Sequence, residues 1–199
     1  MKIPGFQLVR VIEFRVDAAP VRDVWKNTGQ PALSNGVAIV PFSAAYAGAV
    51  AKARSPSEMD AFSLMADRGE SGWLALDPSE RIVGHCWRID NRGDGVVRSS
   101  VPIDPGWAYM HYGWVDPSRR GQGILPALMC SSMLQALAIS GWSVRGFSAD
   151  IAPENTASQR SVSKLGFAPV HLFTSVRVAH RWFQVQVHDI SAEGEVSET

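Results

Sequence analysis

The 199-residue sequence has only two cysteines, Cys86 and Cys130, and both lie among apolar neighbours. Two cysteines do not make the disulfide framework of a small secreted domain, and without a Cys-x-x-Cys pair they do not suggest a zinc site. The five histidines also lack the His-Glu-x-x-His spacing of a metal-binding helix. We therefore predict two buried, reduced thiols, a cytoplasmic location and no bound metal.

The sequence also lacks an excess of charge and a long apolar run. Basic and acidic residues each number 19, and this balance argues against a nucleic-acid or anionic membrane partner. No apolar run approaches the roughly 18 residues of a membrane span, and the start of the chain has no apolar signal segment. Residues 189–199 hold four acidic and no basic side chains, which leaves 19 basic and 15 acidic residues elsewhere. That mild positive excess suits an anionic small ligand better than a polyanion.

What the sequence does contain is an apolar fraction of 46%, arranged in alternating and helical patterns. These patterns predict strands over residues 6–16, 37–42, 73–76, 82–89, 107–115, 142–151, 173–178 and 182–187. They predict helices over residues 20–26, 43–54, 57–69, 125–139 and 156–165, with Ser43 as the N-cap of the second and Ser57 opening the third. The order is that of a layered α/β sheet with mixed strand directions. We expect residues 1–35 to form an N-terminal extension (a strand and a short helix), residues 36–190 the main domain and residues 191–199 a disordered acidic tail.

The segment richest in chemistry runs from Val115 to Leu125, between a predicted strand and a predicted helix. Gly121 and Gly123 let backbone N–H groups converge, and the helix that follows presents the positive end of its dipole, so the turn suits a pyrophosphate. A third glycine of a dinucleotide-binding fingerprint is replaced by Pro126, and there is no Gly-Lys-Ser/Thr of a Walker loop. A tight strand-to-helix turn with no ligand is the alternative.

Two motifs in this part of the chain resemble those of the GNAT superfamily of N-acetyltransferases. Arg120-Gly121-Gln122-Gly123-Ile124-Leu125 is similar to the acyl-CoA loop of that superfamily, although Leu125 stands where the family has a small residue. Asn155-Thr156-Ala157-Ser158, followed by Lys164-Leu165-Gly166-Phe167, is similar to its second motif. The resemblance covers residues 37–188.

The resemblance implies a mixed, largely antiparallel twisted sheet with helices on both faces. It also implies that the strands over 107–115 and 142–151 form a splayed parallel pair, with a bulge, around acetyl-CoA. The main chain of Trp114 and Val115 would bind pantetheine, and Asn155 and Ser158 would contact the same arm. The loop from Arg120 through Gly121, Gln122, Gly123 and Ile124 to Leu125 would bind the pyrophosphate with its N–H groups. Arg160 would bind a CoA phosphate, with solvent exposure as the alternative.

His111 is the residue that the resemblance suggests as the general base, because it lies on the cleft strand and histidine is the residue type best suited to accept a proton near neutral pH. The alternative is a packed histidine bonded to a neighbour. Many family members carry a proton-donating tyrosine in the second motif, but Val162 occupies that position, so Tyr112, Ser158 and Ser161 are the candidates to protonate the thiolate. The acceptor pocket would be lined by Trp87, Arg88, Trp107 and Tyr109. Arg88 and Arg92 would pair with an acidic acceptor, unless they belong to a solvated loop.

We expect an N-acetyltransferase that transfers an acetyl group from acetyl-CoA to the primary amine of a small molecule, by direct attack on the thioester. A protein N-terminal or ribosomal-protein acetyltransferase and a non-catalytic CoA-binding module are the alternatives. The resemblance also suggests a homodimer, with the strand over residues 6–16 at an edge of the sheet or paired with a partner.

Overall fold

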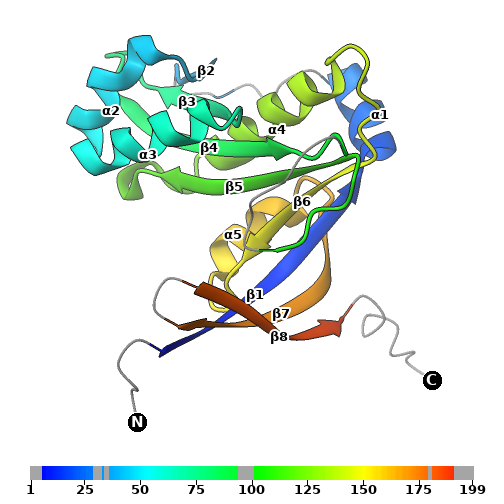
Figure 1. Ribbon diagram of the computed structural model, residues 1–199. Coiled ribbons are helices and arrows are strands. Elements are labelled where there is room, and N and C mark those ends of the chain that lie inside the picture. Colours follow the sequence, from blue (N-terminus) through cyan, green and yellow to red (C-terminus); the bar gives the residue numbers. More distant parts are fainter. Residues whose placement is uncertain (1–5, 29–32, 34–35, 94–100, 179–180, 191–199) are drawn as a thin grey trace.

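The computed structural model describes residues 6–28, 33, 36–93, 101–178 and 181–190, and the tail predicted over 191–199 lies outside them (Figure 1). The described strands form one eight-stranded sheet in the order β2-β3-β4-β5-β6-β1-β7-β8, in which the β5–β6 pair is parallel and the other described pairs are antiparallel. The strands are β1 (Phe6–Asp17), β2 (Ala38–Pro41), β3 (Ser71–Leu76), β4 (Ile82–Asp90), β5 (Trp107–Val115), β6 (Gly146–Ile151), β7 (Ala168–Val178) and β8 (Arg181–Asp189). The helices are α1 (Ala18–Thr28), α2 (Ala47–Ala53), α3 (Pro56–Asp67), α4 (Ile124–Leu137) and α5 (Thr156–Ser163), with 3-10 turns η1 (Ala44–Tyr46) and η2 (Pro117–Arg119).

Helices cover both faces of the sheet, which confirms the predicted fold class. Successive residues of β3 and β4 point to opposite faces: Ala75 and Cys86 pack in the core beneath α4, whereas Leu74 and Trp87 pack in the core beneath α2 and α3. Figure 1 shows α2 and α3 side by side and well apart from α1. α4 is apolar around most of its circumference because it lies between the sheet, α1 and α5.

β1 is an interior strand of the sheet. Its residues Ile12–Asp17 pair with β6, and Phe6–Arg15 pair with β7. Phe14 and Val16 enter the same core as α4. The strand therefore joins the domain's own sheet, as one of the two alternatives expected. From Ile12 to Arg15 it is interior and not at an edge, because both of its backbone edges are paired there within the chain.

Several element boundaries differ from those predicted. β6 begins at Gly146 rather than Trp142, and β7 begins at Ala168 rather than Phe173. α3 is capped by Ser55, whose Oγ accepts the N–H of Glu58 at 3.2 Å, and not opened by Ser57. Pro56 explains the shift, since proline fits the first helical position and places the cap directly before it.

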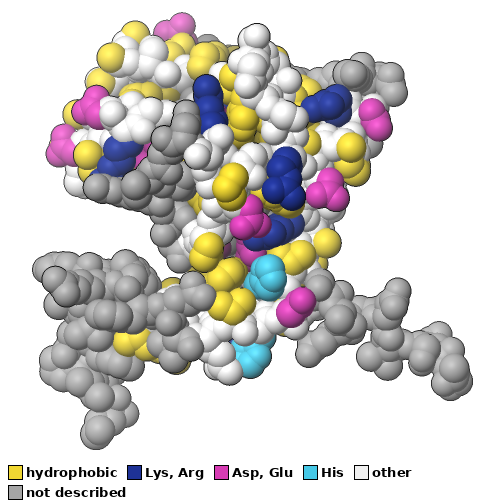
Figure 2. All heavy atoms as spheres, turned by 45° about the vertical axis from the view of Figure 1, so that its right-hand side comes forward, with side chains coloured by type: hydrophobic (Ala, Val, Ile, Leu, Met, Phe, Trp, Pro, Cys, Tyr) yellow, Lys and Arg dark blue, Asp and Glu magenta, His cyan; other side chains and the backbone are white. Residues whose placement is uncertain are grey.

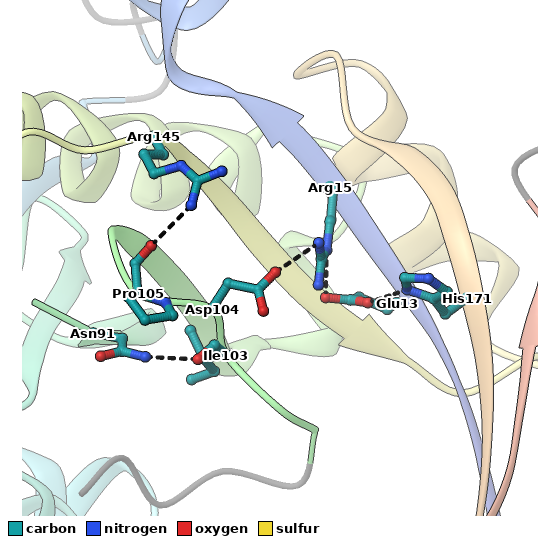
Figure 3. Close-up of polar contacts among 8 residues, drawn as sticks. All are labelled: Glu13, Arg15, Asn91, Ile103, Asp104, Pro105, Arg145 and His171. Carbon is teal, nitrogen blue, oxygen red and sulfur yellow. Dashed lines mark hydrogen bonds and ion pairs between the residues drawn. The ribbon is translucent and has the colours of Figure 1, made fainter. Parts of the chain in front are cut away.

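The segment that leads into β5 is fastened across the sheet by polar contacts (Figure 3). Asp104 Oδ2 accepts from Arg15 Nη1 at 3.0 Å, and the carbonyl of Ile103 accepts from Asn91 Nδ2 at 2.6 Å. Val101 of this segment is buried against Tyr109. These contacts fix the beginning of β5, the strand on which most of the candidate site depends.

Glu13 lies beneath this segment and has no exposed surface. Its two oxygens lie 2.7 Å from Arg15 Nε and 2.7 Å from His171 Nδ1 (Figure 3). A buried carboxylate needs such partners, because an unpaired charge in the interior is strongly destabilising. Figure 2 shows that basic and acidic side chains lie beside one another on this side of the molecule, close to histidine side chains.

Candidate acyl-CoA site

The parallel strands β5 and β6 separate after a short stretch of pairing. Trp107–Met110 pair with Gly146–Ala149, and the register ends there although both strands continue. Figure 1 shows the two strands diverging from a common end. A cavity of about 250 Å³ lies where they part, lined on one side by Met110–Gly113 and on the other by Ala149–Ala152. The gap that the resemblance implied is therefore present.

A β-bulge in β5 accompanies this separation. His85 opposes Trp114 and Trp87 opposes His111, so one residue of β4 faces both Tyr112 and Gly113. Tyr112 has a φ of 52°, a left-handed conformation that costs a non-glycine residue about 1–3 kcal/mol. The bulge interrupts the ladder, so that Tyr112 and Gly113 have no one-to-one register partners in β4.

The glycine loop opens α4 beside this gap. Gly123 is the N-cap of α4 with a φ of 76°, and Gly121 has a φ of 78°. The first N–H groups of a helix have no intrahelical acceptor, so this end of α4 presents donors and positive dipole charge. A second cavity, of about 320 Å³, lies over the loop and includes Arg119, Arg120 and Lys164. It fits an anionic group.

The start of α5 joins the two cavities. Asn155 caps this helix by accepting the N–H of Ser158 at its Oδ1, at 3.2 Å. Both residues, together with Gly113 and Leu125, line both cavities, which makes one continuous cleft. The cap uses the side-chain oxygen of Asn155 and leaves its NH₂ group to donate into the cleft.

His111 lies in the first cavity and meets an acid that the sequence did not single out. Its Nε2 lies 3.0 Å from Glu70 Oε2, with side-chain exposures of 18% and 8%. The two atoms are not aligned as a hydrogen bond, and neither has a hydrogen-bond partner in the described part of the chain. The Tyr109 ring stacks on the His111 ring at 5.5 Å, and its hydroxyl donates to Asp150, which also lines the cavity.

The three candidate proton donors occupy different surroundings. The Tyr112 hydroxyl donates to Glu58 Oε2 at 3.0 Å, and burial and this bond raise the pKa of Tyr112. Ser161 Oγ donates to the carbonyl of Ala157 at 2.9 Å, and Ser161 lines only the cavity over the loop. Ser158 lines both cavities. The buried Val162 lines the first cavity, but its side chain has no proton that it could donate.

Several predicted site residues are placed apart from the cleft. The Arg160 guanidinium bonds to Thr156 Oγ1 at 3.3 Å, and Arg160 lines neither of the two cavities. Gln122 does not line them either. Arg120 does line the cavity over the loop, but its backbone N–H donates to the carbonyl of Pro117 at 3.5 Å. Trp114, Val115, Gly121, Ile124 and Leu125 do line the cavity over the loop.

The residues expected to line an acceptor pocket mainly pack against or bond to other parts of the protein. Arg88 is fully buried, bonded to Asp90 and to Ser132 and Gln135 of α4, so its expected pairing with an acidic acceptor is wrong. Trp87 is buried beneath α2 and α3, and Trp107 lies under the Arg15 guanidinium. Tyr109 stacks on His111, and Trp87 is the register partner of His111 across the β4–β5 ladder.

The fold and the cleft together define the class: this is the fold of the GNAT acetyltransferases. No family model matches the sequence, and no curated protein matches it. The chain is similar to a tandem GNAT protein from the clavulanic acid biosynthesis pathway, with 15% identity and a TM-score of 0.62 over 92% of this chain and 55% of that one. It is also similar to a GCN5-related N-acetyltransferase from Sphaerobacter thermophilus, with 20% identity and a TM-score of 0.53 over 90% of this chain and 53% of that one.

A third similar structure is the aminoglycoside antibiotic 6'-N-acetyltransferase AAC(6')-Ih from Acinetobacter baumannii, with 17% identity and a TM-score of 0.50 over 67% of this chain and 91% of that one. The chain spans about half the length of the first two structures. At these identities the likeness establishes the fold. No helix among the described residues combines the length and apolarity needed to cross a bilayer.

Proposed function

We propose that this protein is an acyl-CoA-dependent N-acyltransferase that uses acetyl-CoA to acetylate the primary amine of a small molecule. The observation that carries the proposal is the continuous cleft between the glycine loop and the gap between β5 and β6. Acyl transfer from CoA to an amine needs a site for the CoA phosphates and a group that accepts a proton. The helix start at one end of the cleft suits the phosphates, and the histidine beside a carboxylate at the other end suits the proton.

The loop end of the cleft suits the phosphates of CoA. Arg119, Arg120 and Lys164 supply positive charge, and the start of α4 supplies N–H donors. The pantetheine amides would pair with backbone groups of Gly113, which the bulge leaves without a register partner in β4 and which lines both cavities. The thioester would then lie in the first cavity, beside His111.

The His111 end of the cleft suits removal of a proton from the attacking amine. Glu70 Oε2 lies 3.0 Å from His111 Nε2, close enough for the carboxylate to pair with the ring once the ring holds the proton. The amine nitrogen forms a bond to the thioester carbonyl carbon, the C–S bond breaks, and the ammonium proton passes to His111. The thiolate takes a proton from Tyr112 or Ser158, the two candidate donors that line this cavity.

The test is turnover of acetyl-CoA against a panel of polyamines, amino sugars, aminoglycosides and a peptide with a free N-terminus, with product mass as the readout. We expect acetylation of a small amine, and a loss of about 100-fold in kcat/KM for His111→Gln with an unchanged Kd for CoA. Glu70→Gln should lower kcat by about tenfold, because it removes a group that orients His111. Acetylation of the peptide alone would contradict the small-molecule substrate and would favour a protein acetyltransferase.

Val162 favours a second candidate, a CoA-binding protein without transferase activity. It is buried and lines the first cavity at the position where the resembling family often has a proton-donating tyrosine. This candidate predicts saturable CoA binding with no acetylation of any amine in the panel. Val162→Tyr is the matched variant, since a gain of turnover on its introduction would identify the missing proton donor.

A further inference from the structure

His85 is buried directly behind the bulge of β5, with 1% of its surface exposed. It projects from β4, and its ring stacks on Tyr112 and on Trp114, both at 5.6 Å, with interplanar angles of 28° and 22°. Phe62 of α3 closes a further side of the ring at 4.7 Å. The imidazole thus contacts the residues on either side of Gly113.

The ring is also hydrogen-bonded to the bulge itself. His85 Nδ1 lies 2.9 Å from the carbonyl oxygen of Tyr112. A carbonyl only accepts, so Nδ1 carries the proton, and Nε2 is left buried without a hydrogen-bond partner among the described residues. A histidine that buries one ring nitrogen unpaired in order to donate from the other is unusual, because an unsatisfied buried polar atom costs about 1–3 kcal/mol.

We propose that His85 is a positioning residue that holds the bulge of β5 in the conformation that opens the cleft. Tyr112 has a left-handed φ of 52° that a tyrosine does not favour. The bond from Nδ1 fixes the carbonyl of this residue toward His85, whereas Gly113, which has no partner in the β4 register, lines the cleft. The consequence for CoA rests on the proposed function, whereas the effect on the bulge does not.

The protonation state agrees with this role. Burial, followed by the positive charge of Arg54, lowers the pKa of His85 to about 4. The neutral Nδ1–H tautomer is therefore retained throughout the pH range in which His111 would act as a base. His85 does not line either cavity, so it acts through the bulge and not on a substrate.

Two variants separate the hydrogen bond from the packing. His85→Phe keeps an aromatic ring and loses the donor, whereas His85→Asn loses the ring and keeps an NH₂ group close to the place of Nδ1. Ile82→Ala is the matched control, because it removes a fully buried side chain of the same core whose register partner is Leu76 and not His85. Amide hydrogen exchange in ligand-free protein measures the bulge, and calorimetric titration with CoA measures the cleft.

We expect His85→Phe to speed exchange of the amides of residues 112–114 and to weaken CoA binding by about tenfold. In His85→Asn, the exchange rates of these amides and the affinity for CoA should both stay within about threefold of the wild type, although this variant should be less stable than His85→Phe. Ile82→Ala should lower the free energy of unfolding and keep both the exchange rates of residues 112–114 and the affinity for CoA. Unchanged amide exchange in His85→Phe would overturn the inference. Equal losses of CoA affinity in His85→Phe and His85→Asn would also overturn it. A wild type that does not bind CoA while the exchange pattern holds would instead overturn the proposed function.

Discussion

The two ends of the cleft are built in different ways. The loop end consists of consecutive residues between β5 and α4, and its chemistry comes from backbone N–H groups and the helix start. At the other end, side chains from three places meet: Glu70 before β3, Tyr109 and His111 of β5, and Asp150 of β6. The first kind of site follows from local sequence, whereas the second exists only once the sheet has brought distant residues together.

The largest loss of activity is expected from substitution of His111, at the end of the cleft where distant side chains meet. His111→Gln should lower kcat/KM by about 100-fold or more, since a positioned general base contributes about 10²–10⁴. The Kd for CoA should not change, because the loop end is intact. Steady-state kinetics with titration of CoA check both values. A parallel loss of CoA affinity would mean that the two ends are not separable.

The next effect concerns acid stability, which depends on the buried His85. The folded-state pKa of about 4 lies below the ordinary value of 6.5, so the unfolded chain takes up this proton first as the pH falls. The free energy of unfolding should fall between pH 6.5 and 4, by up to about 3 kcal/mol from this group. Urea denaturation across this range checks it, and the fall should be smaller in His85→Phe by that amount. An identical pH dependence in both proteins would contradict the burial argument.

A smaller effect is expected at the loop end from Gly123. Gly123→Val places a β-branched residue at a φ of 76°, which strains the N-cap of α4 and should weaken CoA binding by about tenfold. Gly141→Val is the matched control, because Gly141 has a φ of 78° but lies outside both cavities. Calorimetry and thermal unfolding together check the pair. Equal CoA affinity of the two variants would remove the loop from the site.

The smallest effect distinguishes two basic residues of the second motif. Lys164 lines the cavity over the loop and Arg160 does not, so Lys164→Ala should weaken CoA binding about threefold and Arg160→Ala should leave it unchanged. The Lys164 effect should shrink at high salt, since an exposed charge is screened. The reverse ranking would restore the assignment of Arg160 made from the sequence.

Much of the fold was predictable because its signals are local. The strand over 107–115 was predicted with both boundaries, and the glycine loop with its flanking Pro126 marked the start of α4. Ser55 was missed as a cap because Ser57 offered the same side chain two positions later. The interior position of β1 could not be predicted from the sequence, because its partners β6 and β7 lie far along the chain and such pairing leaves no local pattern.

The candidate site divides in the same way. The sequence named the loop residues and His111, but it gave no signal for Glu70, which precedes β3 and meets His111 only through the β3–β4–β5 ladder. His85 carried one unused signal: it is a histidine in an otherwise apolar strand, where a polar ring requires a partner. Arg88 shows the opposite error, because a buried structural arginine and a substrate-binding one look the same in sequence.

Calorimetric titration of CoA into the wild-type protein tests the central claim most directly. We predict saturable binding of one CoA per chain, weakened by rising salt and by Gly123→Val but not by Gly141→Val. Absence of any binding heat at millimolar CoA, or binding that is indifferent to Gly123→Val, would contradict the assignment of the cleft.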